Sequence, residues 1–191
     1  FKFPSPNAFF AQRKEVVDEL FPGDIVGLHD TGNFKIGDTL TEGEKMQYKG
    51  IPNFSPEHFR YINNADPMKS KQLEKGVQQL MDEGVAQLFT LSLNNRKVIG
   101  TVGALQYEVI QYRLEHEYGA KCTYEPINIH KACWIEADEK DPDFEEFKRV
   151  KQRYLAHDKS GKLVFLADSK FTLQMTEQKY TSVKFHSVSE F

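Results

Sequence analysis

Gly100 and Gly103 lie between an apolar run and a helical pattern, in the stretch that extends from Val98 to Ala120. A strand, a glycine turn and a helix in this order can bind phosphate, because the first N–H groups of a helix have no partner inside it. The glycine spacing, however, fits neither Gly-x-x-x-x-Gly-Lys-Ser/Thr nor Gly-x-Gly-x-x-Gly. We therefore interpret the stretch as scaffold, in which Gly103 permits the turn and Gly100 lets a helix approach the sheet.

The histidine pattern does not indicate side-chain catalysis. The six histidines are scattered and form neither a His-Glu-x-x-His motif nor a Ser-His-Asp arrangement. His116 lies between two glutamates in a helical pattern, which is typical of a solvated helix surface. The sequence therefore predicts no catalytic, cofactor-binding or metal-binding residue. The histidines are His29, His58, His116, His130, His157 and His186.

Cys122 and Cys133 are the two cysteines of the chain, and they do not form a Cys-x-x-Cys pair. Two cysteines without an export signal favour free thiols in a reducing cytoplasm. His130 is close enough to Cys133 to share a metal, but a structural zinc site needs four ligands and no second pair is near. We expect no metal here.

A run of basic residues follows two glutamates in a helical pattern between Phe144 and Tyr154. Acidic residues early and basic residues late complement the helix dipole, which explains the run without a ligand. A contact with RNA phosphate is the alternative, because neutralising phosphates releases bound counterions. The basic residues are Lys148, Arg149, Lys151 and Arg153.

Composition places limits on the fold class and on the partners. The chain has 191 residues, 39% of them hydrophobic, and a formal net charge of -3. This charge gives no general reason to expect a nucleic-acid binder, so any basic surface must be local. No apolar run approaches the roughly 18 residues that span a bilayer, and no signal peptide is recognisable, so we expect no membrane. Because the chain begins at Phe1, we expect a piece of a longer protein.

Residues 1–54 have the pattern of short antiparallel strands. Turns are predicted at Pro22-Gly23-Asp24 and Thr31-Gly32-Asn33, with strands at Ile25–His29 and around Phe34 and Ile36. This is too little chain for a closed barrel, so we predict an incomplete β-barrel. The proline-rich stretch from Ile51 to His58 predicts a linker.

Residues 55–191 predict an α/β domain, so that the whole chain is α+β. Over about 58–130 the predicted order is strand, helix, strand, strand, helix, strand, which is a ferredoxin-like unit, and an α/β extension follows. Asp66 is a good N-cap for the first helix and Gly84 a good stop. Gly76 inside that helix predicts a close packing contact.

The second helix of this unit is apolar on two sides, so we expect the sheet on one side and another element, or a partner, on the other. A ferredoxin-like unit can also be an RNA-recognition module, but KVIGTV lacks the aromatic residues that stack bases, and Phe59 and Tyr61 supply half of the signature. The two sides carry Leu105, Val109 and Tyr112, and Tyr107, Ile110, Leu114 and Tyr118, respectively.

Several separated segments resemble one family. DPMKSKQLEKGVQQLMDEGVAQLF and GTVGALQYEVIQYRLEHEYGAKCTYE resemble the third domain of ribosomal translational GTPases. With IPNFSPE before them and FEEFKRVKQRYLA after them, they are similar to the C-terminal portion of the bacterial peptide chain release factor 3 family. FPGDIVGLHDTGNFKIGDTLTEG resembles the closing strands of that family's second, β-barrel domain. Elongation factor G has Ile-Ser-Gly-Met-Gly-Glu-Leu-His where this chain has IGTVGALQY.

The resemblance implies a role in translation termination. Members of this family speed the departure of class I release factors from the ribosome, and they bind GTP and magnesium in an N-terminal domain that nothing in this chain matches. The resemblance thus implies a cytoplasmic fragment that is not itself an enzyme and that serves as a ribosome-binding and conformational-coupling arm. Lys148, Arg149, Lys151 and Arg153 become candidate contacts with the ribosome, whose rRNA and proteins are the expected partners. The arm of an elongation factor G-like GTPase and a stand-alone ferredoxin-like ligand-binding domain stay as alternatives.

Overall fold

The computed structural model describes residues 6–10, 13–29, 34, 38–44, 46 and 54–189. It is a mixed α/β structure with two antiparallel sheets. Among the described residues, no helix is both long and apolar enough to cross a membrane.

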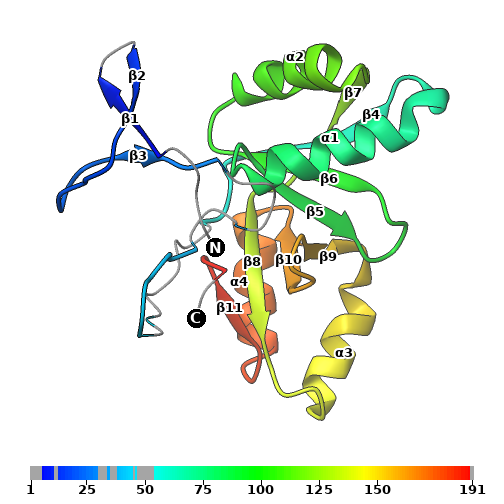
Figure 1. Cartoon of the computed structure of the whole chain (residues 1–191). Helices are drawn as coiled ribbons and strands as arrows, with labels where there is room; N and C mark the ends of the chain where they lie inside the picture. The colour runs from blue at the N-terminus through cyan, green and yellow to red at the C-terminus, as the bar shows by residue number, and fades with distance from the viewer. Residues whose placement is uncertain are drawn as a thin grey trace.

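The first sheet has three strands in the order β2-β1-β3 (Figure 1). These strands are β1 (Asn7–Phe10), β2 (Arg13–Val16) and β3 (Val26–Gly27). The strand expected at Ile25–His29 is present in a shortened form as β3. The strand expected around Ile36 lies outside the described residues, so the incomplete β-barrel of residues 1–54 stays a prediction.

The second sheet has eight strands in the order β11-β8-β10-β9-β5-β6-β4-β7, and every neighbouring pair is antiparallel. Four α-helices and two 3-10 turns accompany it (Figure 1). The strands are β4 (His58–Asn64), β5 (Gln87–Leu91), β6 (Lys97–Thr101), β7 (Cys122–Pro126), β8 (Lys131–Glu136), β9 (Leu155–Asp158), β10 (Leu163–Ala167) and β11 (Lys184–His186). The helices are α1 (Ser70–Asp82), α2 (Gln106–Tyr118), α3 (Pro142–Val150) and α4 (Lys170–Lys179), and the 3-10 turns are η1 (Pro67–Lys69) and η2 (Gln152–Tyr154).

The chain order β4-α1-β5-β6-α2-β7 is the strand and helix order that the sequence predicts. At the start of the first helix, the carboxylate of Asp66 accepts the backbone N–H of Met68, and Pro67 fits the first position. The first turn is 3-10, and the α-helix begins at Ser70. Gly84 follows the helix with a φ of 73°, a left-handed conformation that glycine adopts without strain.

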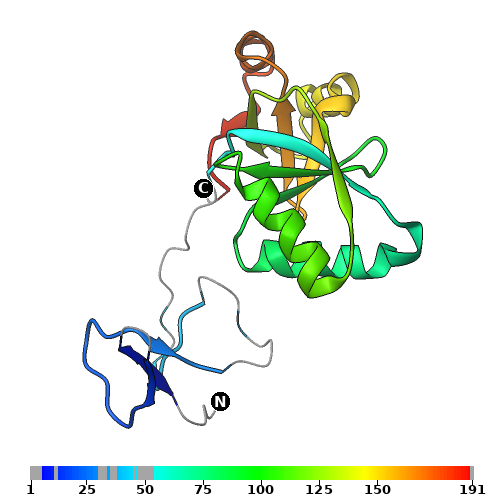
Figure 2. The ribbon, with the colours of Figure 1, turned by 90° about the horizontal axis from the view of Figure 1, so that it is seen from above.

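Three hydrophobic clusters hold the layers together. One lies between α1, α2 and the strands β4 to β7, and another lies between α3, α4 and the strands β8 to β11. The third joins Phe59 and Phe89 of the first half of the sheet to Trp134 and Val164 of the second half. Strands that are far apart in the sheet order thus share a core, so the sheet curves and its two halves face one another (Figure 2).

The curved sheet overturns the RNA-recognition alternative. In that module, aromatic side chains on the open sheet face stack on bases. Here Phe59 is only 6% exposed, because it packs in the layer between the two half-sheets. The ring of Tyr61 is covered by the guanidinium of Arg96, whose Cζ is 3.5 Å from the ring centroid. Neither ring is therefore an open platform on which a base could stack.

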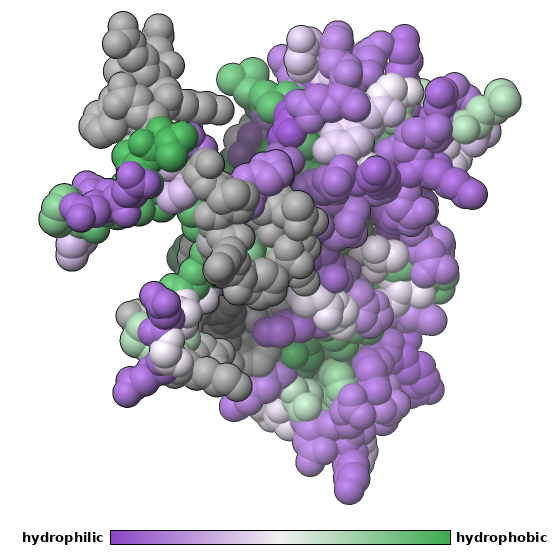
Figure 3. Space-filling view, viewed as in Figure 1, coloured by the Kyte–Doolittle hydropathy of each residue, from purple (hydrophilic) through white to green (hydrophobic). Residues whose placement is uncertain are grey.

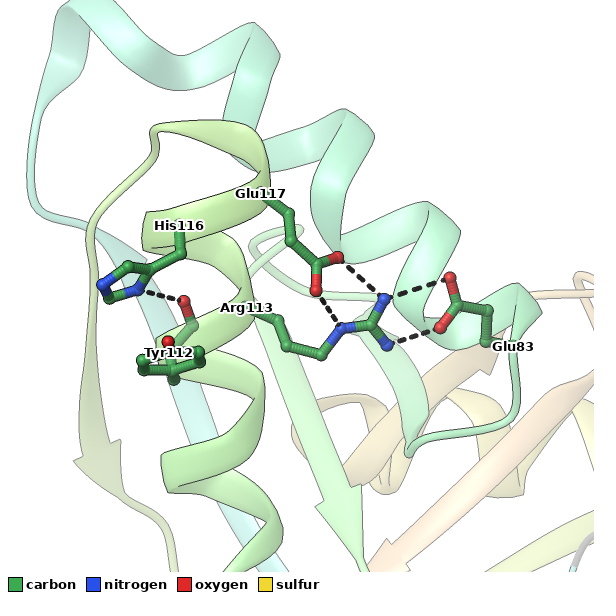
Figure 4. Close-up of polar contacts among 5 residues, drawn as sticks. All are labelled: Glu83, Tyr112, Arg113, His116 and Glu117. Carbon is green, nitrogen blue, oxygen red and sulfur yellow. Dashed lines mark hydrogen bonds and ion pairs between the residues drawn. The ribbon is translucent and has the colours of Figure 1, made fainter. Parts of the chain in front are cut away.

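Helices α1 and α2 pack tightly on one another. A Cβ added to Gly76 would be 2.7 Å from Leu114 and 2.8 Å from Tyr118, so the predicted close contact is confirmed. Beside it, Arg113 of α2 binds the carboxylates of Glu83 and Glu117, which ties the end of α1 to α2 (Figure 4).

The interpretation of Gly100 is wrong. A Cβ at this position would lie 2.5 Å from Pro56, so the glycine makes room for the segment before β4 and not for a helix. That segment is docked on the sheet: the Ser55 N–H donates to Ser187, the Ser55 hydroxyl accepts from Ala132, and Gln87 donates to Phe54. The second half of the predicted linker is therefore part of the packed structure.

The expectation that α2 is covered on both sides holds for one side. Tyr107, Ile110 and Leu114 are buried, whereas Leu105 and Tyr112 are 72% and 63% exposed. No element in the described part of the chain covers the second side. The face of the α/β part seen in Figure 3 is mostly hydrophilic, so exposed apolar side chains are a minority on it.

Candidate nucleic-acid interface

The predicted basic helix is divided between two elements. The helix begins with a capped first turn, in which the Asp141 side chain accepts the N–H of Asp143 and Pro142 occupies the first position. The α-helix ends at Val150, however, and a 3-10 turn, η2, follows. A continuous helix to Tyr154 is therefore wrong. Tertiary packing ends the helix here. Leu155 is only 3% exposed and already belongs to β9, so it needs an extended backbone.

Lys148 and Arg149 remain on the last turn of α3. Lys148 is occupied within its own helix: its ammonium pairs with Glu145 and lies 4.6 Å from the centre of the Phe144 ring. Arg149 is exposed and has no ion-pair partner among the described residues. Of these two adjacent residues, Arg149 therefore has an unpaired positive charge for a ligand, whereas the charge of Lys148 is already neutralised.

Lys151 and Arg153 gather around the Tyr154 ring. Arg153 donates to the Tyr154 hydroxyl and stacks 4.6 Å from the ring centre, and the Lys151 ammonium is 5.9 Å from the same centre. The hydroxyl in turn donates to Asp168, with an oxygen-to-oxygen distance of 2.9 Å. Hydrogen bonds hold the pKa of the Asp168 carboxyl below its usual range, the largest coming from Thr172 and another from Tyr154. An aromatic ring thus orients both basic side chains.

A further cation, Lys179 at the end of α4, joins this group. Its ammonium pairs with Glu146 at 2.8 Å and lies 4.8 Å from the centre of the Tyr180 ring. Sequence reasoning missed this residue, because the region after β10 reads as a short helix or turn. In the structure α4 has ten residues and ends beside α3. Ser169 as an N-cap, accepting from Thr172, is the signal that predicts a longer helix.

Lys151 is at the centre of this positive charge. Partial burial lowers the pKa of its ammonium, and the neighbouring cations Lys179 and Arg153 lower it further, while Asp168 opposes them. The neighbouring cations that disfavour the charged form of Lys151 also attract an anion. We define the basic patch as Arg149, Lys151, Arg153 and Lys179.

The other candidate positions have structural roles. The side-chain oxygen of Gln106 accepts the N–H groups of Val102 and Gly103 at 2.9 and 3.2 Å, so the chain itself occupies the place where a phosphate would sit before α2. His116 stacks on Tyr112, with 4.0 Å between the ring centres, and bonds the Tyr112 carbonyl (Figure 4).

Cys122 and Cys133 are buried free thiols. Burial raises the pKa of the Cys133 thiol to about 11, which leaves it unreactive at neutral pH. Within the described residues, no three His, Cys, Asp or Glu side chains come together as a metal site.

Comparisons with known proteins place the chain in a family. The family model described as class II release factor RF3, C-terminal domain, matches residues 48–177. This match spans more than half of the chain. The chain belongs to the class II release factor RF3 family. A second model, elongation factor G domain 2, matches residues 1–43. Both matches agree with the C-terminal portion of a translational GTPase.

A solved structure supports the fold. One similar chain is the protein ttk003000868 from Thermus thermophilus, known from a crystal structure, with a TM-score of 0.55 and 16% sequence identity. The alignment covers 72% of this chain and 23% of the solved chain. At this identity the likeness concerns the fold alone, and the present chain spans about a quarter of the length of that structure.

Proposed function

We propose that this chain is the arm by which a translational GTPase binds the ribosome and couples its conformation to the departure of class I release factors in termination. The observation that carries the proposal is the match of the RF3 C-terminal domain model over residues 48–177. The whole protein would bind GTP and magnesium in another domain and act in the cytoplasm.

The architecture suits such an arm. We assign residues 1–54 to the closing strands of a barrel domain and residues 55–191 to the C-terminal domain. The strand order β7-β4-β6-β5 with two crossing helices supports a ferredoxin-like core in the latter. Its three hydrophobic clusters form adjoining packed layers, and a close-packed body transmits a displacement that a flexible one would absorb.

The basic patch is the part of this arm that we propose contacts ribosomal RNA. Arg149 and Arg153 are exposed, and neither forms an ion pair within the described residues, so their charges are available to phosphates. Lys148 and Lys179 contribute less, because Glu145 and Glu146 pair with them. Of the four predicted contacts, Arg149, Lys151 and Arg153 are therefore the principal ones.

Charge reversal in the full-length protein tests this contact. We expect Arg149→Glu with Arg153→Glu to weaken ribosome binding and to lower the slope of log affinity against log salt by roughly 1–2, since each neutralised phosphate contributes about 0.7–0.9. Co-sedimentation with ribosomes across a salt series measures this slope. Lys69→Glu with Lys71→Glu, at exposed positions where the first helix begins, is the matched control. Equal slopes for the two double variants would eliminate the contact.

An assay of factor recycling tests the termination role itself. We expect the full-length protein to accelerate the departure of a class I release factor from ribosomes after peptide release, and the double variant at Arg149 and Arg153 to do so more slowly. The match of residues 1–43 to elongation factor G domain 2 favours translocation as the second candidate role. Acceleration of translocation without any effect on release-factor departure would select that second role.

A further inference from the structure

The outward face of α4 carries two exposed apolar side chains. Phe171 is 71% exposed and Met175 is 49% exposed, and their spacing of four residues places them one turn apart on the same side of the helix. The opposite side of α4 is packed, since Leu173 and Thr176 are buried. Single exposed apolar residues are common on protein surfaces, whereas here an aromatic ring and a flexible thioether adjoin. We call this pair the apolar stripe of α4.

Positive charge lies along one edge of the apolar stripe. Helices α3 and α4 are side by side at the outer edge of the α/β part (Figure 2). Where they end, the stripe borders a cleft of about 430 Å³ that is also lined by Lys151 and Lys179. At the other end of α4, Arg153 stacks on the ring of Tyr154, whose hydroxyl donates to Asp168 just before the helix. Cations therefore flank the stripe at both of its ends.

The other groups around the stripe are polar. Gln174 and Gln178 are exposed on α4, and a carboxamide can both donate to and accept from the edge of a base. The acids in this region are Glu146, which pairs with Lys179, Asp168, which accepts from Tyr154, and Glu177, which is exposed on α4. Cations outnumber these acids, although the formal net charge of the chain is -3. The cations are Arg149, Lys151, Arg153, Lys170 and Lys179.

We propose that this face of α4 binds an unpaired nucleotide of an RNA strand, whose base stacks on the Phe171 ring while Lys151 and Arg153 contact the flanking phosphates. An aromatic platform beside a track of cations is the combination that holds single-stranded RNA, because every base has a flat face and every linkage a negative charge. Met175 extends the platform. The ribosome as the source of the RNA rests on the proposed function, whereas the stacking site itself does not.

The composition of this face favours RNA over a protein partner. A helix that docks on a partner through its apolar side needs several apolar anchors, at spacings such as i, i+3, i+4 and i+7. The apolar stripe has two members, and Gln178, the residue that follows on the same side of α4, is polar. A small apolar platform between cations is instead the complement of a base between two phosphates.

Fluorescence anisotropy with a labelled oligoadenylate and the full 191-residue chain tests the proposal. We expect Phe171→Ala to weaken binding about tenfold, the loss that removal of one stacked base typically causes. Phe171→Leu keeps an apolar side chain without a ring, so it should lose nearly as much. Leu105→Ala on α2 is the matched control, since Leu105 is 72% exposed, and it should bind as the original chain does.

An abasic oligonucleotide of the same length separates stacking from phosphate contact. It offers phosphates without bases, so the original chain and Phe171→Ala should bind it equally. In a salt series with the oligoadenylate, Phe171→Ala should keep the slope of log affinity against log salt, because no charge is removed. Lys151→Gln should lower that slope by about 0.7, the contribution of one phosphate of a single strand. The melting temperature of Phe171→Ala should be unchanged, because the ring is mostly exposed.

Absence of oligoadenylate binding would overturn the proposal, as would binding that Phe171→Ala leaves unchanged or weakens equally for the abasic strand. Binding of a glutamate-rich amphipathic peptide that depends on Phe171, with RNA binding that does not, would overturn it in favour of a protein partner. Oligoadenylate binding that depends on Phe171, together with unchanged ribosome affinity of a full-length Phe171→Ala variant, would uphold the site and count against the proposed ribosome contact.

Discussion

At Gly76, a single missing side chain sets the distance between two helices. A Cβ there would meet Leu114 and the Tyr118 ring at 2.7 and 2.8 Å, and a ring atom cannot move aside as the end of a flexible side chain can. We expect Gly76→Ala to destabilise the protein by about 1–3 kcal/mol through overpacking, although alanine favours the helix by about 1 kcal/mol.

Urea denaturation measures this change, and Gly103→Ala is its control. A Cβ at Gly103 would have no neighbour within 4 Å, and its φ is not in the left-handed region, so the control should lose little. A stabilised Gly76→Ala variant would contradict the packing argument.

The ion pair of Arg113 with Glu117 makes the stability of α2 sensitive to pH. Hydrogen bonds from Arg113 lower the pKa of the Glu117 carboxyl, so this ion pair contributes stability above the ordinary glutamate pKa and loses it as the pH falls below about 4. We expect Arg113→Met to be less stable than the original chain at pH 7, with the difference shrinking towards pH 3. Chemical denaturation at both pH values tests this. A difference that is constant over the range would show that packing, and not charge, is what the arginine contributes.

At the scale of elements, α3 is anchored by one aromatic side chain. Phe147 is fully buried and contacts four other rings, Phe144, Phe165, Tyr180 and Phe185. We expect Phe147→Ala to cost about 3–5 kcal/mol, since it leaves a cavity among rings that cannot collapse easily. Thermal unfolding checks this.

Val150→Ala on the same helix is the control for that prediction. Val150 is 51% exposed, so its truncation should change stability by less than about 0.5 kcal/mol. Since α3 leads directly into Lys151 and Arg153, Phe147→Ala should also weaken any binding to the basic patch. Similar stability losses for the two variants would mean that α3 is not held by its buried ring.

Local signals in the sequence predict those helices and strands whose position depends only on neighbouring residues. The N-cap Asp66 and the stop at Gly84 bound the first helix, and the strand and helix order of 58–126 follows from apolar periodicity. The C-terminal end of α3 cannot be predicted from the local sequence, because it depends on Leu155 entering the sheet between distant strands. For the same reason the sequence predicts only part of the candidate site. Lys151 and Arg153 are in the basic run, whereas Lys179 joins them only through the packing of α4 on α3.

At the scale of the whole molecule, the two half-sheets share one core and should unfold together. Trp134, the single tryptophan, is 1% exposed in the layer between the halves and donates to Asp158. We expect its fluorescence and the far-ultraviolet circular dichroism to change in one coincident transition on denaturation. Two separated transitions would show that the halves are independent units, and Trp134→Phe identifies the signal.

The segment at Phe54–Pro56, which hydrogen bonds to β5, β8 and the end of the chain and packs on β6, determines how a pull on the α/β part is distributed. A force that enters through these residues acts on both half-sheets at once, because β5 and β6 belong to one half and β8 to the other. A pull on residues 54–56 is therefore expected to displace the α/β part as a unit.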